Sequence, residues 1–164
     1  MYRTQSDVAS KSLENQALCL QQMVNAIVKC CEDRRIFENQ KFGLPYTEIR
    51  CLLLFQDKDY LSVNEIAYRL DVAKSRGTKL VRGLLERGFV ERVEDPRDNR
   101  VRQISPTEEG RNKIREVEAF HQKIHKEILN QFDAGDRSGV LTTLESLHDC
   151  MERVKQRLVA GQSD

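Results

Sequence analysis

Hydrophobic positions at both ends of the chain recur at steps of four and three, the spacing of a long helix that packs against another helix. In the first segment, where we expect a helix over residues 6–36, this seam consists of Leu13, Ala17, Leu20, Val24, Ile27 and Cys31. The last segment repeats it at Val140, Leu144, Leu147, Met151, Val154 and Leu158. Such a seam is buried only against another seam. The pattern therefore predicts, at both ends of the chain, a helix that needs a helical partner.

Between these segments the pattern indicates short helices. An apolar helix is expected over residues 46–55, after a break at Gly43 and Pro45. Ser62 and Glu65 have the spacing of a capping box, which predicts the start of a second short helix. A tight turn and a third helix over residues 74–87 follow, with basic side chains on the solvent face. Two short helices joined in this way predict a helix-turn-helix.

A basic β-hairpin is expected directly after the helix-turn-helix. Gly88 supplies the left-handed residue that commonly ends a helix, and β-favouring residues follow it. Residues 95–99 combine Pro, Asp and Asn and are typical of a turn between two strands. A second capping box is expected at Ser105, with Pro106 at the first helical position, so that a long helix runs from there to Phe132.

Charge is concentrated in the same region. The 164 residues carry a formal net charge of only +1. Between Lys74 and Arg102, nine basic residues stand against five acidic ones, a distribution expected for a DNA-binding surface. No apolar run approaches the length of a membrane span, and five cysteines without a C-x-x-C motif are typical of reduced thiols. We therefore expect a cytoplasmic protein with no membrane partner.

These patterns predict a mainly α-helical fold with a small β-hairpin wing, a winged helix-turn-helix with long N- and C-terminal dimerisation helices. The expected domains are a helical dimerisation module, residues 6–40 and 106–160, and a winged helix-turn-helix DNA-binding lobe, residues 44–105. The sequence contains no nucleophile elbow, no phosphate-binding glycine loop and no HExxH motif. We therefore expect no enzymatic activity, no catalytic residue and no cofactor.

Two short motifs, together with the order of the elements, resemble the MarR family of bacterial transcription regulators. Residues 95–100, Asp-Pro-Arg-Asp-Asn-Arg, are similar to the family's wing signature Asp-x-Arg-Asp-x-Arg, and residues 105–110 to its Leu-Thr-x-x-Gly helix start. The resemblance covers residues 10–159. It implies a homodimer that holds two winged lobes over a pseudo-palindromic operator in double-stranded DNA. It also implies repression that a small ligand or oxidation relieves.

The resemblance also assigns DNA contacts to the second helix of the helix-turn-helix and to the wing. Arg97 would enter the minor groove, with Asp95 holding its guanidinium. The expected DNA-binding residues are Lys74, Ser75, Arg76, Thr78, Lys79, Arg82, Asp95, Arg97 and Arg100. Gly77 and Gly83 depart from the family's usual residues at their positions. Because a glycine within a helix costs about 1 kcal/mol relative to alanine, they predict a less rigid recognition helix.

The signal that the regulator senses is open at this point, and a small aromatic or amphipathic ligand is our preferred effector. The resemblance implies that such ligands bind between the dimerisation helices and the DNA-binding lobes. The candidate pocket residues are Phe42, Leu44, Tyr46, Phe55 and Phe120, although for any one of them a place in the core is the more usual role. Thiol sensing is a second hypothesis, with Cys19, Cys30 and Cys31 as its candidates.

Metal sensing is a further alternative. His121 and His125 lie four residues apart and so share one helix face, but a metal needs about four ligands and the chain has only three histidines. We therefore expect no metal. A rival hypothesis from a different class is a winged-helix protein-interaction module that does not bind an operator.

Overall fold

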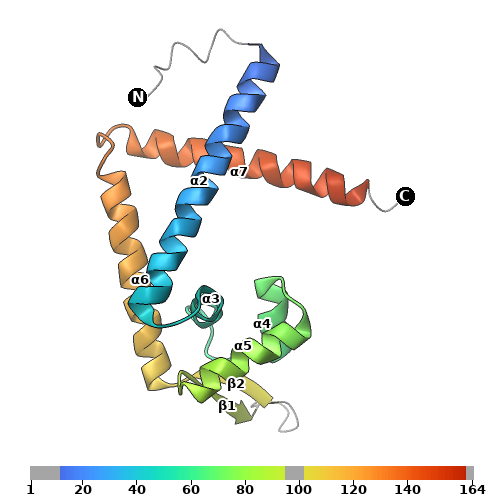
Figure 1. Cartoon of the computed structure of the whole chain (residues 1–164), viewed down its shortest axis with the longest axis vertical. Helices are drawn as coiled ribbons and strands as arrows, with labels where there is room; N and C mark the ends of the chain where they lie inside the picture. Colours follow the sequence, from blue (N-terminus) through green and yellow to red (C-terminus); the bar gives the residue numbers. More distant parts are fainter. Residues whose placement is uncertain (1–11, 95–101, 162–164) are drawn as a thin grey trace. The chain divides into compact units, whose positions relative to one another are not determined.

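The computed structural model describes residues 12–94 and 102–161 (Figure 1). In chain order the elements are α2 (Leu13–Phe42), α3 (Tyr46–Leu53), α4 (Val63–Leu70), α5 (Lys74–Glu86), β1 (Val90–Glu94), β2 (Arg102–Pro106), α6 (Glu108–Leu129) and α7 (Arg137–Ala160). The two strands pair antiparallel, with Val90 opposite Pro106. The described residues thus form six helices and one hairpin, which confirms the predicted mainly helical, winged helix-turn-helix fold.

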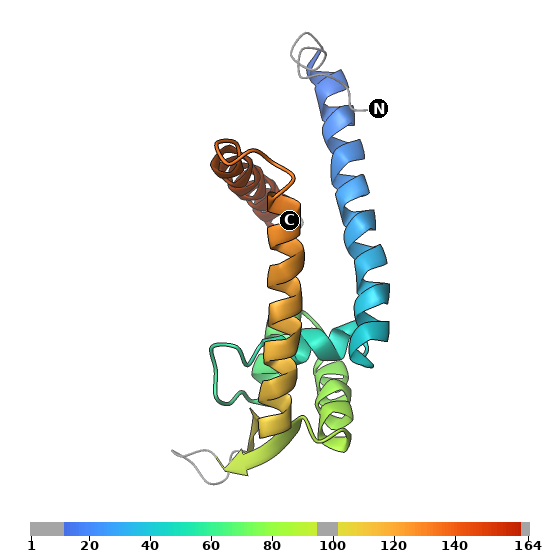
Figure 2. The ribbon, with the colours of Figure 1, turned by 90° about the vertical axis from the view of Figure 1, so that its left-hand side faces the viewer.

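The chain separates into two compact units, one ending at Val117 and the other beginning at Glu118. All buried apolar residues of the described chain belong to the N-terminal unit, where α3, α4 and α5 pack together beside the hairpin (Figures 1 and 2). This core consists of Phe42, Leu44, Ile49, Cys51, Leu52, Phe55, Leu61, Ile66, Ala67, Leu70, Leu80, Val81, Leu84, Val90, Ile104, Ile114 and Val117. In the part of the chain that the structure describes, no helix is both long enough and apolar enough to cross a membrane.

The helix-turn-helix is shaped by capping interactions at both ends of α4. The Ser62 hydroxyl accepts a hydrogen bond from the Glu65 backbone at 3.2 Å, and the Ser62 backbone donates to the Glu65 carboxylate at 2.7 Å. This confirms the predicted capping box. At the other end Asp71 adopts a left-handed conformation, with φ of 54°, and the Val72 N–H donates to the Ala67 carbonyl at 3.0 Å. The chain therefore turns sharply into α5.

Gly88 follows the C-cap of α5 and has the predicted left-handed conformation. Its φ is 74°, and its N–H donates to the Leu85 carbonyl at 3.0 Å. The next N–H, that of Phe89, donates to the Leu84 carbonyl at 3.0 Å. These two bonds form a Schellman motif, which satisfies the last carbonyls of α5 and starts β1 immediately afterwards.

The start of α6 differs from the prediction. Pro106 is the last residue of β2, so the capping box predicted at Ser105 is wrong. Strand pairing continues through Pro106, and the Ser105 hydroxyl instead donates to the Asp59 carbonyl at 2.8 Å. Thr107 caps α6: its hydroxyl accepts from the Gly110 N–H at 3.0 Å and donates to the Gly88 carbonyl at 2.7 Å. Thr107 therefore ties the start of α6 to the end of α5.

Candidate DNA-binding site

Helix α5 has one buried and one exposed face. Leu80, Val81 and Leu84 are buried, and Gly77 is buried with them. All expected DNA-binding residues on this helix are exposed: Lys74, Ser75, Arg76, Thr78, Lys79 and Arg82. Side chains three and four positions apart share a helix face, so the packing of the apolar stripe turns the basic stripe outward.

Gly77 lies where α5 approaches α4 closely. A Cβ at this position would lie 2.9 Å from the Ala67 Cβ and 3.5 Å from the Val63 carbonyl oxygen. Cβ atoms do not approach each other this closely, so a larger residue would push the two helices apart. The glycine thus has a packing role that the sequence pattern did not reveal.

Gly83 makes a similar approach to α3. A Cβ there would lie 2.7 Å from Oε1 of Glu48, whose side chain is 13% exposed. The other carboxylate oxygen, Oε2, is 3.3 Å from Nε of Arg87, the C-cap residue of α5. Sequence reasoning missed Glu48 because its partners lie far along the chain and it occupies an ordinary polar position in a short helix.

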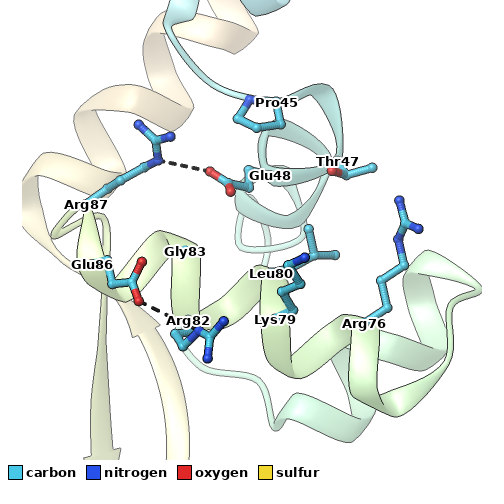
Figure 3. Close-up of a pocket in the computed structure, with 10 residues that line it drawn as sticks. All are labelled: Pro45, Thr47, Glu48, Arg76, Lys79, Leu80, Arg82, Gly83, Glu86 and Arg87. Carbon is cyan, nitrogen blue, oxygen red and sulfur yellow. Dashed lines mark ion pairs between the residues drawn. The ribbon is translucent and has the colours of Figure 1, made fainter.

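A cavity of about 520 Å³ lies between α3 and α5 (Figure 3). Its walls are formed by Pro45, Thr47, Glu48, Arg76, Lys79, Leu80, Arg82, Gly83, Glu86 and Arg87. Two of the four cations in its wall form ion pairs with carboxylates of the same wall. Arg87 pairs with Glu48, and Arg82 pairs with Glu86 at 3.7 Å. The other two, Arg76 and Lys79, form no ion pair with the described residues.

The wing residues Asp95, Arg97 and Arg100 lie outside the described residues. The strands that flank them are described, and Glu94 pairs with Arg102 at the end of the hairpin.

The residues expected to line an effector pocket have different environments. Phe42, Leu44 and Phe55 are 6%, 2% and 3% exposed and belong to the core of the N-terminal unit. Tyr46, the first residue of α3, is half-buried under the Arg35 guanidinium, whose carbon lies 4.7 Å from the ring centroid. None of the five candidates contributes to the wall of the α3–α5 cavity.

The fifth candidate, Phe120, belongs to the C-terminal unit together with the two histidines. It is half-buried, and its ring centroid is 6.1 Å from that of His121. The His121 and His125 rings are 6.4 Å apart on one side of α6, as their spacing predicted. Among the described residues, no group of three or more His, Cys, Asp or Glu side chains is placed to hold a metal ion.

All five cysteines are free thiols in different surroundings. Of the predicted sensor candidates on α2, Cys30 is exposed, whereas Cys19 and Cys31 are half-buried. Cys51 is buried in the core, and burial, followed by the nearby Glu48 carboxylate, raises the pKa of its thiol to about 12. Cys150 on α7 is exposed.

The fold and the exposed basic helix define a winged helix-turn-helix protein of the nucleic-acid-binding class. The MarR family matches residues 42–100. The uncharacterized HTH-type transcriptional regulator YdgJ of Bacillus subtilis is 21% identical over 113 residues, 69% of each chain.

Two solved structures share the fold. A MarR family protein from Bacillus stearothermophilus has a TM-score of 0.76 at 22% identity, covering 87% of this chain and 99% of that one. Streptococcus pneumoniae FabT, solved in complex with DNA, has a TM-score of 0.70 at 18% identity, covering 82% and 99%. Residues 42–100 thus match the MarR family of winged helix-turn-helix transcriptional regulators, and the described chain shares the fold of the two solved structures.

Proposed function

We propose that the protein is a homodimeric repressor that binds a pseudo-palindromic operator, with α5 in the major groove and the wing in the minor groove. The observation that carries this proposal is the exposed basic face of α5. On this face Arg76 and Lys79 form no ion pair with any described residue, so both are available to phosphates and base edges. FabT, a relative in fold, is bound to DNA in its solved structure. Such a repressor acts on the genome, in the cytoplasm.

The two parts of the lobe, residues 44–105, have different tasks in this proposal. Arg76 and Lys79 reach base edges and set sequence preference, whereas Arg97 at the wing meets phosphate and the minor groove, which carry less sequence information. Lys79→Ala should weaken binding to the preferred site by about 1–3 kcal/mol more than it weakens binding to random duplex. Arg97→Ala should weaken binding to the preferred site and binding to random duplex by similar amounts. Lys126→Ala, which removes an exposed cation from the C-terminal unit, is the matched control.

A binding titration on DNA upstream of the protein's own gene, and on sites selected from a random pool, tests the proposal. Wild-type protein should prefer one site strongly over random duplex. If affinity is equal for all duplexes and no site is selected, the protein-interaction module becomes the better hypothesis.

The dimerisation module in this proposal consists of residues 6–40 and 106–160. It is supported by the apolar seam of α7, on which Leu144, Met151, Val154 and Leu158 are 44–65% exposed in the single chain. Apolar side chains in a continuous row favour burial against a second copy. Leu144→Asp should therefore convert a dimer into a monomer in sedimentation experiments at micromolar concentration. Thr142→Asp, which places the same charge on another face of α7, should leave the dimer intact.

We propose that a small aromatic or amphipathic ligand relieves repression. The α3–α5 cavity supports this proposal, because 520 Å³ is within the range of about 300–1,000 Å³ found for ligand sites. An occupant there would compete with DNA for the cations of α5. DNA release should follow titration with small aromatic carboxylates and persist when Cys19, Cys30 and Cys31 are all changed to Ser. Release of the wild type by mild peroxide, with the triple variant resistant, would instead establish thiol sensing.

A further inference from the structure

Glu48 rests against the bare backbone of α5. Its Oε1 atom lies 2.7 Å from the point that a Cβ of Gly83 would occupy, so a side chain at residue 83 would displace the carboxylate from this position. Its Oε2 atom is 3.3 Å from Nε of Arg87, at the end of the same helix. The side chain of Glu48 is 13% exposed, whereas that of Arg87 is 46% exposed. One carboxylate from α3 therefore faces α5 at Gly83 and pairs with Arg87 just after it, and Figure 3 shows that pair.

The N-terminal half of α5 has its own contact, at Gly77 against Ala67 of α4. The helix is thus held against α4 at Gly77 and against α3 at Gly83 and Arg87. The exposed side chains proposed to read the operator lie on the same short helix. Base-edge hydrogen bonds require donor–acceptor distances within a few tenths of an ångström, so they are sensitive to small rotations of the helix that presents them.

We propose that Glu48 is a positioning residue for sequence recognition: it fixes the rotation of the C-terminal half of α5 and thereby sets the discrimination between operator and random DNA. The inference rests on the proposed operator binding by α5. Glu48 itself contacts no base in this scheme. It acts through Gly83 and Arg87.

Glu48 is also a negative charge among the cations of the cavity, and the two roles have separable consequences. Removing a negative charge from a DNA-binding surface tightens binding to every duplex, because attraction to the phosphates is independent of sequence. Loosening the helix weakens only the contacts that depend on its orientation. A change in the ratio of operator affinity to random-duplex affinity therefore indicates a change in the orientation of α5. An equal change in both affinities indicates the electrostatic contribution of the Glu48 charge.

The test compares Glu48→Gln with Glu109→Gln. Both changes remove one carboxylate charge from the N-terminal unit, but Glu109 is exposed on α6 and lies outside the cavity wall. Glu48→Gln should lower the operator-to-random ratio by roughly tenfold, the factor that corresponds to 1.4 kcal/mol. Glu109→Gln should leave the ratio within about twofold of wild type.

Two further variants separate positioning from a general loss of stability. Gly83→Ala forces the Glu48 carboxylate away and should lower the ratio in the same direction, with the circular dichroism spectrum of the wild type retained. Arg87→Gln should lower the ratio in the wild-type background and have little further effect in the Glu48→Gln background. An unchanged ratio in folded Glu48→Gln, with wild-type operator preference intact, would overturn the inference. Absence of any preference in the wild type would overturn the operator binding on which it rests.

Discussion

The two units of the chain bury their side chains very differently. The N-terminal unit holds all the buried residues of the described chain, from Glu38 to Val117. Within the described C-terminal residues 118–161 none is buried, and Leu141, Leu144 and Leu158 are 50–65% exposed. A single chain therefore contains the interactions that fold the DNA-binding lobe. Helix α7, by contrast, carries apolar side chains that the described single chain leaves exposed.

The glycines of the two units show the same contrast. Gly77, Gly83 and Gly110 lie where a Cβ would meet a neighbouring atom at 2.9 Å or less, whereas Gly135 and Gly139 have nothing within 4 Å. Gly77, Gly83 and Gly110 thus permit close approach of two elements, whereas Gly43 and Gly88 of the same unit have a positive φ and open space around them. No described glycine of the C-terminal unit would place a Cβ closer than 3.4 Å to another atom. Substitutions at matched positions can therefore measure how complete each unit is.

The largest effect is expected for Gly110→Ala compared with Gly139→Ala. A Cβ at Gly110 would lie 1.9 Å from the Phe89 carbonyl oxygen, which also accepts a hydrogen bond from the Thr107 N–H at 3.1 Å. Neither backbone can move without breaking the junction of hairpin and α6, so we expect a loss of about 3 kcal/mol or more in the free energy of unfolding. Gly139→Ala should stabilise the protein by about 0.5–1 kcal/mol, because alanine favours the helix.

Urea unfolding followed by circular dichroism measures both changes. A destabilising Gly139→Ala would mean that another chain packs closely on this position, which would strengthen the assignment of α7 to an interface. A neutral Gly110→Ala would contradict the tight junction described for the lobe.

The features that the sequence predicted correctly depend on neighbours within a few residues. The capping box of Ser62 and Glu65 and the helix end at Gly88 are local, and both lie where they were expected. The start of α6 was predicted wrongly because it depends on pairing between Pro106 and Val90, which are far apart in sequence.

The candidate site divides in the same way. The alternation of apolar and basic residues along α5 was enough to predict its exposed cations, such as Lys79. The pairing of Glu48 with Arg87 and the packing of Gly83 arise only when α3 and α5 come together, and no periodicity records such contacts. Sequence patterns therefore predicted which side chains of α5 are exposed but not how that helix is held.

A second comparison uses the thiols of the two units. Burial, followed by the Glu48 carboxylate, raises the pKa of Cys51 from 9.0 to about 12. As pH rises, the thiol loses its proton at a lower pH in the unfolded chain than in the folded one. The free energy of unfolding should therefore fall between pH 9 and pH 12, by about 1.4 kcal/mol per pH unit. Cys51→Ala removes this contribution, and the difference in stability between wild type and variant should decline over that range.

Alkylation gives an independent measurement. The thiolate is the reactive form, so at pH 8 iodoacetamide should label exposed Cys150 readily and Cys51 only as the lobe unfolds. If Cys150 is labelled slowly in concentrated protein and rapidly after the protein is diluted, a second chain covers α7. Rapid labelling of Cys51 in folded protein would contradict its burial.

The smallest effect is expected at the helix N-termini. Ser62 caps α4 through its hydroxyl, whereas Asp136 at the start of α7 makes no side-chain cap hydrogen bond. Ser62→Ala should therefore cost about 1 kcal/mol in the free energy of unfolding, and Asp136→Asn less than about 0.5 kcal/mol, because it loses only a charge near the helix dipole. A larger loss for Asp136→Asn than for Ser62→Ala would reverse the comparison between the two units.

The pH dependence of the α4 cap shows whether its carboxylate contributes. Hydrogen bonds from Ser62, the backbone N–H first, lower the pKa of Glu65 below 4.5. Because the folded value is the lower one, this contribution is present above pH 4.5 and is lost as the pH falls through the folded pKa. The stability difference between wild type and Glu65→Gln, measured by urea unfolding, should therefore be constant near neutral pH and shrink below pH 4.5. A difference independent of pH would mean that Glu65 caps α4 no better than a neutral amide does.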